Sequence, residues 1–325
     1  MGKAENLRIA VLGPLGASEE QIQTMTEEII GEGVSFDFHL SVAAEPSAMI
    51  ACAQDADVVI ISNLPFPREV VEGCPKLRAL FLSFTGTDRI DLVACKEAGI
   101  TVSYAPDYST PAVAEFALGL ILAFLRKLTE GDTAARGGRT WQGLAGGELA
   151  GRTVGFVGTG NIGLRLAGLL KGFGCPLLGF DLKHRDEAIA LGLEYTDLDD
   201  LLSRSDVVSL HLPLTDQTNC LLDARRLGLM KPSAILVNTA RGQLVDNAAL
   251  AEALREQRLA GACLDTLDVR PPLPPEHPLL DAPNTLLTPH MAFATREAFM
   301  RRSRIVLENV AAWRQGAPEN VVSVP

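Results

Sequence analysis

Aromatic residues are scarce in this sequence of 325 residues: they make up 5%, and only two of them are tryptophan. Hydrophobic residues nevertheless account for 47% of the chain and charged residues for 21%, which is ordinary for a globular protein with a sizeable core. Small and aliphatic side chains must therefore fill that core, and they favour helices packed closely on a sheet. The length is about twice that of a typical domain, so we expect two domains.

Runs of lysine and arginine are also absent, and the formal net charge is −11 at pH 7. This balance argues against nucleic acid and against an anionic membrane as partners, so a few placed arginines must hold any anionic substrate. No apolar run reaches about 18 residues, so no membrane-spanning helix is expected. Met1 is followed by Gly-Lys-Ala-Glu and not by an apolar leader, so we expect a cytoplasmic protein.

Cysteine pairs with the spacing of a metal or redox site are missing as well. The six cysteines are scattered singly, at Cys52, Cys74, Cys95, Cys175, Cys220 and Cys263. We interpret them as reduced thiols of the core, and we expect no metal site.

Short apolar runs alternate with amphipathic stretches along nearly the whole chain. This alternation indicates βαβ units with parallel sheets and therefore an α/β fold. Strands are expected at 7–12, 34–40, 57–61, 78–83 and 100–103, and in a second series at 153–157, 176–180, 206–210, 234–238, 261–264 and 285–287. Helices are expected at 19–30, 90–97, 111–128, 162–173, 247–257 and 295–315. A glycine-rich connector at 131–151 and a proline-dense loop at 270–277 interrupt the pattern.

A glycine-rich turn follows the first strand of the second series. Gly158-Thr-Gly160-Asn-Ile-Gly163 fits the pattern G-x-G-x-x-G, with a strand before it and a helix opening within it. The first glycine makes the tight bend, the second lets the backbone approach a pyrophosphate, and the third allows close helix–strand packing. Asp181 ends the next strand about 18 residues later, near the spacing of an acid that binds the adenosine ribose. These features together predict an NAD site. The earlier turn at 13–16 lacks the fingerprint, so we interpret it as structural.

Six segments make the chain resemble the D-isomer-specific 2-hydroxyacid dehydrogenases, a family that includes phosphoglycerate, glycerate, D-lactate and formate dehydrogenases. The segments are TGTDRIDL at 85–92, PDYSTPAVAE at 106–115, the turn at 158–163, SDVVSLHLPLT at 205–215, MKPSAILVNTARG at 230–242 and LLTPH at 286–290. The resemblance implies two Rossmann-like domains with parallel sheets and a cleft between them. It further implies a discontinuous substrate domain (1–103 plus 293–325), an NAD-binding domain (104–292) and a homodimer.

The resemblance also implies two catalytic residues. Arg241 would hold the carboxylate of a 2-oxo acid and polarise its carbonyl, because a guanidinium fork matches a carboxylate. The alternative is a surface arginine that pairs with Asp246. His290 would be the acid/base, which donates a proton to the carbonyl oxygen during reduction and takes it back during oxidation. A lone histidine is more often structural, so this role depends on the resemblance.

Binding residues follow from the same comparison with the family. Thr85 and Gly86 would bind the substrate carboxylate through backbone amides, as glycine-containing loops can do. The remaining cofactor contacts that the resemblance implies are Asn161, Ile162, Pro213, Thr218, Thr239, Ala240 and Asp265, the last through the nicotinamide carboxamide. We interpret His211 as structural or as lining the cofactor site.

One position departs from the family pattern. Family members usually have a glutamate, paired with the catalytic histidine, five residues after the aspartate matched by Asp265, and here that position is Arg270. Asp268 and Glu276 are the alternative partners of His290. A cation near His290 would lower the pKa of the histidine and disfavour reduction at neutral pH.

The departure leaves three hypotheses. The first is reversible NAD-linked oxidation of a small 2-hydroxy acid. The second keeps hydride transfer but uses a donor that needs no His–Glu relay, as formate dehydrogenases do, since they also lack this glutamate. The third is a dinucleotide-binding regulator without catalysis, and the presence of both Arg241 and His290 argues against it.

Overall fold

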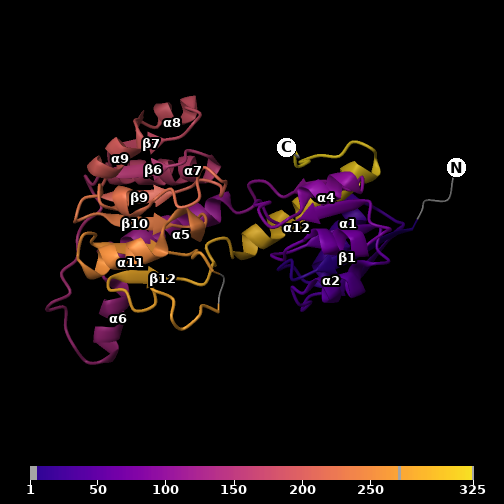
Figure 1. Cartoon of the computed structure of the whole chain (residues 1–325), viewed down its shortest axis with the longest axis horizontal. Helices are drawn as coiled ribbons and strands as arrows, with labels where there is room; N and C mark the ends of the chain where they lie inside the picture. The colour runs from indigo at the N-terminus through magenta and orange to yellow at the C-terminus, as the bar shows by residue number, and fades with distance from the viewer. Residues whose placement is uncertain (1–5, 270–271, 324–325) are drawn as a thin grey trace. The chain divides into compact units, whose positions relative to one another are not determined.

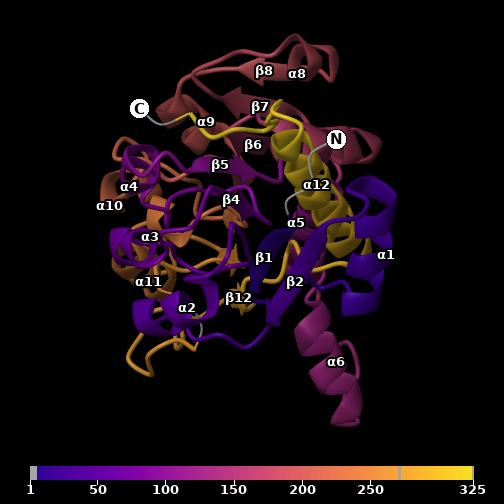
Figure 2. The same ribbon diagram turned by 90° about the vertical axis from the view of Figure 1, so that its right-hand side faces the viewer.

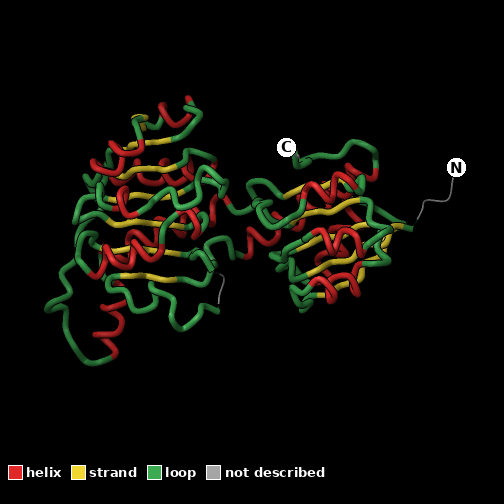
Figure 3. Tube along the Cα trace, viewed as in Figure 1, coloured by secondary structure: helices red, strands yellow, loops and turns green. Residues whose placement is uncertain are grey.

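The computed structural model describes residues 6–269 and 272–323, so Arg270 lies outside the described residues. The chain forms two compact units, which we call unit 1 (Met1–Ser109 and Ala294–Pro325) and unit 2 (Thr110–Phe293) (Figure 1). Helices and strands alternate in both units (Figure 3), and both sheets are parallel. The structure thus confirms the expected α/β class with two Rossmann-like domains.

Unit 1 contains a five-stranded parallel sheet with the order β2-β1-β3-β4-β5. Its strands are β1 (Leu7–Leu12), β2 (Val34–His39), β3 (Val58–Ile61), β4 (Ala79–Leu82) and β5 (Thr101–Tyr104). Its helices are α1 (Glu19–Ile29), α2 (Pro46–Ala53), α3 (Arg68–Gly73), α4 (Leu92–Glu97) and α12 (Arg296–Arg314). Every residue of β3 and β4 is buried. Continuous apolar runs form these strands because helices cover both faces of a parallel sheet.

The C-terminal helix α12 belongs to unit 1, where it packs against α1 and β4, and Figures 1 and 2 both show it beside α1. Asn309 on α12 donates a hydrogen bond to the carbonyl of Tyr104 at 2.9 Å. Arg301 donates to the carbonyl of Tyr108 at 2.8 Å. The second of these bonds holds the segment 105–109 to α12, and the first division between the units falls after Ser109, whereas a division after residue 103 was expected.

Unit 2 contains a seven-stranded parallel sheet with the order β12-β11-β10-β9-β6-β7-β8. Its strands are β6 (Val154–Val157), β7 (Leu177–Phe180), β8 (Leu193–Tyr195), β9 (Val207–Leu210), β10 (Ile235–Asn238), β11 (Gly261–Leu264) and β12 (Thr285–Leu287). Its helices are α5 (Thr110–Leu125), α6 (Leu128–Arg136), α7 (Asn161–Leu170), α8 (Asp186–Ala190), α9 (Leu198–Arg204), α10 (Ala224–Leu227) and α11 (Asn247–Arg255). The strand order reverses between β6 and β9, and open α/β sheets bind ligands at the carboxyl ends of strands at such a point.

Two details of unit 2 differ from the expectation. The expected single helix at 111–128 ends at Leu125, and α6 continues into the expected connector. The cause is Lys127, whose left-handed φ of 50° interrupts the helical path. The short edge strand β8 was not expected, because three residues are too few for a visible alternation. No helix within the described residues has both the length and the apolar character that crossing a bilayer requires.

Candidate active site

The glycine-rich turn joins β6 to α7, and its three glycines meet different surroundings. Gly158 has a φ of 101°, and a Cβ there would lie 2.7 Å from the backbone of His211. A Cβ on Gly163 would lie 2.6 Å from the carbonyl oxygen of Gly158. A Cβ on Gly160 would meet no described atom within 4 Å. Protein packing therefore requires the first and third glycines, whereas Gly160 leaves open space at the start of α7, where a dinucleotide pyrophosphate fits.

Asp181 follows β7 and is held beside this turn. Its Oδ2 accepts hydrogen bonds from the amide and the hydroxyl of Thr159, at 2.7 and 3.2 Å. The Thr159 hydroxyl also lies 2.8 Å from the hydroxyl of Tyr195. The predicted acid and the predicted turn thus belong to one hydrogen-bonded group. The sequence interpretation missed Thr159 and Tyr195, because neither stands at a position of the fingerprint.

His184 and Arg185, which follow β7, contact the same hydrogen-bonded group. The ring of His184 stacks on Tyr195, with ring centroids 4.0 Å apart. The amide of Arg185 donates to the Tyr195 hydroxyl at 3.0 Å. The Arg185 guanidinium donates to Oδ1 of Asn161, the first residue of α7, at 2.8 Å. Tyr195 and Asn161 thus link residues 184 and 185 to the hydrogen-bonded group that holds Asp181.

His211 follows β9 on the other side of the turn. Its Nε2 lies 2.9 Å from the hydroxyl of Ser209, and its ring stacks on Phe156 with centroids 6.1 Å apart. Burial lowers the pKa of His211 from 6.5 to about 4. The residue is therefore neutral near pH 7, which agrees with its interpretation as a structural residue behind the turn.

The segment after β10 carries Arg241. The buried side chain of Asn238 accepts a hydrogen bond from the amide of Ala240 at 3.0 Å and donates one to the carbonyl of Arg241 at 2.8 Å. The Arg241 guanidinium donates to the carbonyl of Ala240 at 2.8 Å. The buried hydroxyl of Thr239 has no hydrogen-bond partner among the described residues, so a bound ligand can supply one. Asn238, which sequence reasoning missed, shapes the turn that presents Arg241.

Asp265, after β11, holds the loop that carries His290. It is 1% exposed and accepts hydrogen bonds from the Thr288 hydroxyl at 2.6 Å and from the amides of Met291 and Ala292 at 2.9 and 2.8 Å. His290 itself has a left-handed φ of 56°. The carboxylate therefore fixes both sides of a strained residue, a role that the resemblance did not suggest.

Asp268 and Glu276, the alternative partners of His290, are both described; Asp268 precedes the proline-dense loop and Glu276 lies within it. Oδ1 of Asp268 is 2.8 Å from Nε2 of the buried His277. Nδ1 of His277 accepts the amide of Leu279 at 3.3 Å, so the proton that neutral His277 carries is on Nε2 and faces Asp268. Glu276 is exposed. The carboxylate of Asp268 thus already binds another histidine.

The remaining predicted residues lie in two further loops. Thr85 and Gly86 follow β4 in unit 1, where the Thr85 hydroxyl donates to the carbonyl of Ala105 at 3.1 Å. Pro213 and Thr218 lie after β9 in unit 2, where the Thr218 hydroxyl donates to the carbonyl of Pro213 at 2.7 Å. Both loops extend from the carboxyl ends of strands.

The predicted residues of unit 2 share one edge of its sheet. The glycine turn follows β6, Asp181 follows β7, Arg241 follows β10, Asp265 follows β11 and His290 follows β12. Since the strands are parallel, their carboxyl ends meet at the same edge. The structure therefore brings together the predicted dinucleotide turn, an arginine and a histidine.

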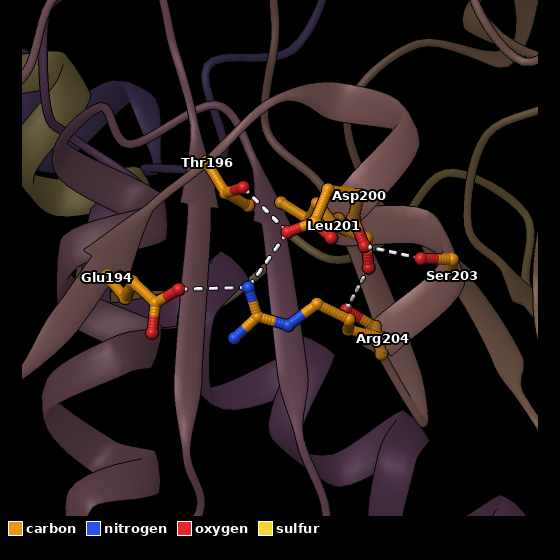
Figure 4. A network of polar contacts seen from close by, with 7 residues as sticks. Glu194, Thr196, Asp200, Leu201, Ser203 and Arg204 are labelled. Atoms are coloured by element: carbon orange, nitrogen blue, oxygen red, sulfur yellow. Dashed lines mark hydrogen bonds and ion pairs between the residues drawn. The ribbon is translucent and has the colours of Figure 1, made fainter.

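A pocket of about 460 Å³ opens at the opposite, amino-terminal edge of this sheet. Its charged side chains pair with one another or with close neighbours, as Figure 4 shows for Arg204, which bonds to Glu194 at 2.9 Å and to Asp200 at 2.8 Å. Lys231 bonds to Asp206 at 2.9 Å. We therefore place the candidate site at the carboxyl edge, where the Thr239 hydroxyl still lacks a partner among the described residues. No group of side chains in the described part of the chain has the composition of a metal site.

Comparison with known proteins decides the family. The model of the D-isomer specific 2-hydroxyacid dehydrogenase NAD binding domain matches residues 118–292. The chain belongs to this family. Similar members include a glyoxylate reductase from Thermofilum pendens, 42% identical over 76% of this chain and 75% of that protein. A D-3-phosphoglycerate dehydrogenase from Methanocaldococcus jannaschii is 34% identical over 98% of this chain and 60% of that protein.

Two solved structures resemble this chain along nearly its whole length. The TT0316 protein from Thermus thermophilus is 35% identical with a TM-score of 0.88, covering 98% of this chain and 100% of that chain. An acyclic imino acid reductase in complex with NADPH and D-Arg is 27% identical with a TM-score of 0.86 at the same coverage. The predicted enzyme class, an NAD-dependent 2-hydroxyacid dehydrogenase, and the predicted dinucleotide cofactor are thereby confirmed.

Proposed function

We propose that this family member interconverts a small 2-oxo acid and its 2-hydroxy acid, with unit 2 as the NAD-binding domain and unit 1 as the substrate domain. The observation that carries the proposal is the grouping of the glycine turn, Arg241 and His290 at one edge of the unit 2 sheet. The bound dinucleotide supplies a hydride to the carbonyl carbon in reduction and accepts one from the hydroxy acid in oxidation. In this proposal Arg241, with Thr85 and Gly86, binds the substrate, and His290 transfers the proton.

Arg241 is the substrate-binding cation in this proposal. Its guanidinium binds the carboxylate and polarises the carbonyl, and the amides of Thr85 and Gly86 in unit 1 also bind the carboxylate. Support comes from Asn238, which fixes the backbone on both sides of Ala240 so that Arg241 leaves the turn in one direction. A fixed arginine matters in a chain with a net charge of −11, because the overall field repels anions.

His290 is the acid/base in this proposal. Its imidazolium donates one proton to the carbonyl oxygen as hydride reaches carbon, and the neutral ring takes that proton back in oxidation. Support comes from Asp265, whose hydrogen bonds to Thr288, Met291 and Ala292 restrain the residues on both sides of His290. A general acid must be held within reach of the reacting oxygen, and this loop is the restrained element that can do so.

Cofactor binding is assigned to the group around the glycine turn. We propose that Gly158, Gly160, Asn161, Ile162 and Gly163 hold the pyrophosphate and that Asp181 binds the adenosine ribose. The other proposed contacts are Pro213, Thr218, Thr239, Ala240 and Asp265. The open space at Gly160 and the buried hydroxyl of Thr239 support this assignment.

A second candidate function keeps hydride transfer but needs no histidine–carboxylate relay. Its support is that Arg270 stands at the usual glutamate position, while the carboxylate of Asp268 binds His277. An imino acid that binds with its nitrogen already protonated needs no acid for hydride transfer, and a reductase of imino acids is among the structures that this chain resembles. A regulator without catalysis, the third hypothesis from the sequence, is not proposed, because Arg241 and His290 are both present.

One experiment separates these candidates. The protein is mixed with NADH and a panel of 2-oxo acids, with and without ammonium, and absorbance at about 340 nm is followed from about pH 5.5 to pH 8.5 around the histidine pKa. Turnover without ammonium supports 2-oxo acid reduction, and turnover only with ammonium supports the imino acid candidate. Binding of NADH without any turnover would contradict both and support the regulator.

We further propose a homodimer formed through unit 2. The support is α6, which extends away from the unit 2 sheet (Figure 1) and exposes 58% of Leu128, together with Trp141 just beyond it, which is 74% exposed. Tryptophan is among the residue types that are enriched in protein–protein interfaces. Sedimentation velocity should give a dimer for the wild type and a monomer for Trp141→Glu; a monomeric wild type would refute the proposal.

The expected cytoplasmic location stays a prediction.

A further inference from the structure

Arg302 on α12 is the bulkiest of the fully buried side chains in the described chain, at 2% exposure. Its Nε donates to the carbonyl of Leu15 at 2.7 Å and its Nη2 to the carbonyl of Pro14 at 2.8 Å. The guanidinium lies 4.6 Å from the centre of the Phe299 ring. Burial lowers the pKa of Arg302, and the neighbouring Tyr108 opposes this effect. A cation is costly to bury, so its placement against two main-chain carbonyls requires an explanation.

The two carbonyls belong to the turn at residues 13–16, which follows β1. The Pro14 carbonyl also accepts a hydrogen bond from the Ser62 hydroxyl at 2.8 Å. Ser62 is 2% exposed and lies directly after β3, and its own amide donates to the carbonyl of Leu12. Arg302 is therefore linked through Pro14 to the loop at 62–67.

These loops stand side by side at the carboxyl edge of the unit 1 sheet. The register pairs Leu12 of β1 with Ile61 of β3, and Ile61 with Leu82 of β4. The turn at 13–16, the loop at 62–67 and the loop that carries Thr85 therefore leave three adjacent strands at the same level. The loop at 62–67 is tied to the third as well, because Arg89 donates to the carbonyl of Asn63 at 3.1 Å.

We propose that Arg302 is a positioning residue of the substrate-binding edge of unit 1. It fixes the turn at 13–16 and, through Pro14 and Ser62, the loop at 62–67, and these two segments shape the space for the side chain of the 2-oxo acid. The inference rests on the proposed function, in which unit 1 binds the acid through Thr85 and Gly86. It gives the turn at 13–16, which we first interpreted as purely structural, a part in substrate selection.

Two variants and a control test the proposal. Arg302→Met removes both bonds to the turn, and Ser62→Ala removes only the bond from Ser62 to Pro14. Ser103→Ala is the matched control, because the Ser103 hydroxyl is equally buried in unit 1 and donates to the carbonyl of Glu319 at 2.8 Å, away from these loops. For each protein, kcat and KM are measured with glyoxylate and with 2-oxobutyrate, the affinity for NADH is titrated, and hydrogen exchange is followed at the amides of residues 15, 16, 63 and 64.

We expect Arg302→Met to raise KM for 2-oxo acids by about tenfold and to change the ratio of the two KM values, because loss of a charged hydrogen bond has an effect of this order. Ser62→Ala should shift KM in the same direction by a smaller factor. NADH affinity should stay within about twofold, and Ser103→Ala should behave as the wild type. If Arg302→Met does not fold, the proposal is tested by the KM values of Ser62→Ala relative to those of Ser103→Ala. Arg302→Lys should restore part of the wild-type KM.

The proposal is overturned if both variants leave the KM values and their ratio unchanged, even if the variants are less stable. Failure of the proposed function looks different, because the wild type would then turn over neither acid. If the wild type turns over neither acid, hydrogen exchange still tests the positioning role of Arg302. Faster exchange at the amides of residues 15, 16, 63 and 64 in Arg302→Met supports this role. Unchanged exchange at these amides overturns it.

Discussion

Replacing Asp265 by alanine should destabilise unit 2 and impair the loop that carries His290. The carboxylate accepts three hydrogen bonds of 2.6 to 2.9 Å, one from the Thr288 hydroxyl and two from the amides of Met291 and Ala292. A hydrogen bond to a charged group contributes roughly 1.5–3 kcal/mol, but Met291 is exposed and water can replace part of the loss. Ala292 is buried, and its amide would be left without an acceptor. We therefore expect a loss of about 4 kcal/mol.

Urea unfolding followed by circular dichroism measures this loss, with Asp246→Ala as the matched control. Asp246 also accepts two main-chain amides, those of Ala248 and Ala249, but as the N-cap of α11, where replacement by alanine costs about 1 kcal/mol. The kcat of Asp265→Ala should fall further than its NADH affinity, because the restraint acts on the His290 loop. If Asp265→Ala loses no more stability than Asp246→Ala and keeps its kcat, the anchoring role is wrong.

Three further predictions concern single residues. Between pH 6.5 and pH 4 the unfolded chain protonates His211 while the native state does not. The free energy of unfolding should therefore fall by about 2 kcal/mol on acidification. This is less than the whole pKa shift of His211 implies, because the residue is only half-buried. In urea titrations, His211→Gln should remove this part of the pH dependence. NADH should bind more tightly than NADPH, because a 2′-phosphate about 4 Å from Asp181 costs on the order of 4 kcal/mol at an effective dielectric of about 20; equal affinities in binding titrations would contradict this. Arg270→Glu should raise reductive turnover near pH 7 and move its falling limb to higher pH, because a carboxylate favours protonated His290; an unchanged pH–rate profile would show that residue 270 acts elsewhere.

Local patterns were enough to predict much of the fold. The buried runs of β3 and β4 were predicted as strands because a parallel sheet covered on both faces accepts apolar side chains at every position. The glycine fingerprint predicted the turn between β6 and α7, in which Gly163 is required by its contact with the carbonyl oxygen of Gly158 in the same segment. Such features depend on a few neighbouring residues, which the sequence displays together.

The residues that fix the loops could not be predicted in the same way. Asp265 bonds to residues more than twenty positions away, and Arg302 bonds to Leu15 across 287 positions. An aspartate that anchors a loop and an aspartate that contacts a ligand have the same sequence signature, so the resemblance suggested only the second role for Asp265. The interruption at Lys127 was missed for a related reason, because a lysine gives no local signal of a left-handed backbone.

In both units a buried charged side chain binds the main chain of a loop at the carboxyl edge of the sheet. In unit 2 the buried carboxylate of Asp265 binds main-chain amides, and in unit 1 the buried guanidinium of Arg302 binds main-chain carbonyls. Each charge is thus hydrogen-bonded to the main chain of the loop that it holds. Loops shaped in this way keep their form without a ligand, which lowers the entropy that binding must otherwise overcome. For an acidic chain that binds an acidic substrate, fixed loops and a few placed arginines can offset a repulsive field that mobile loops could not.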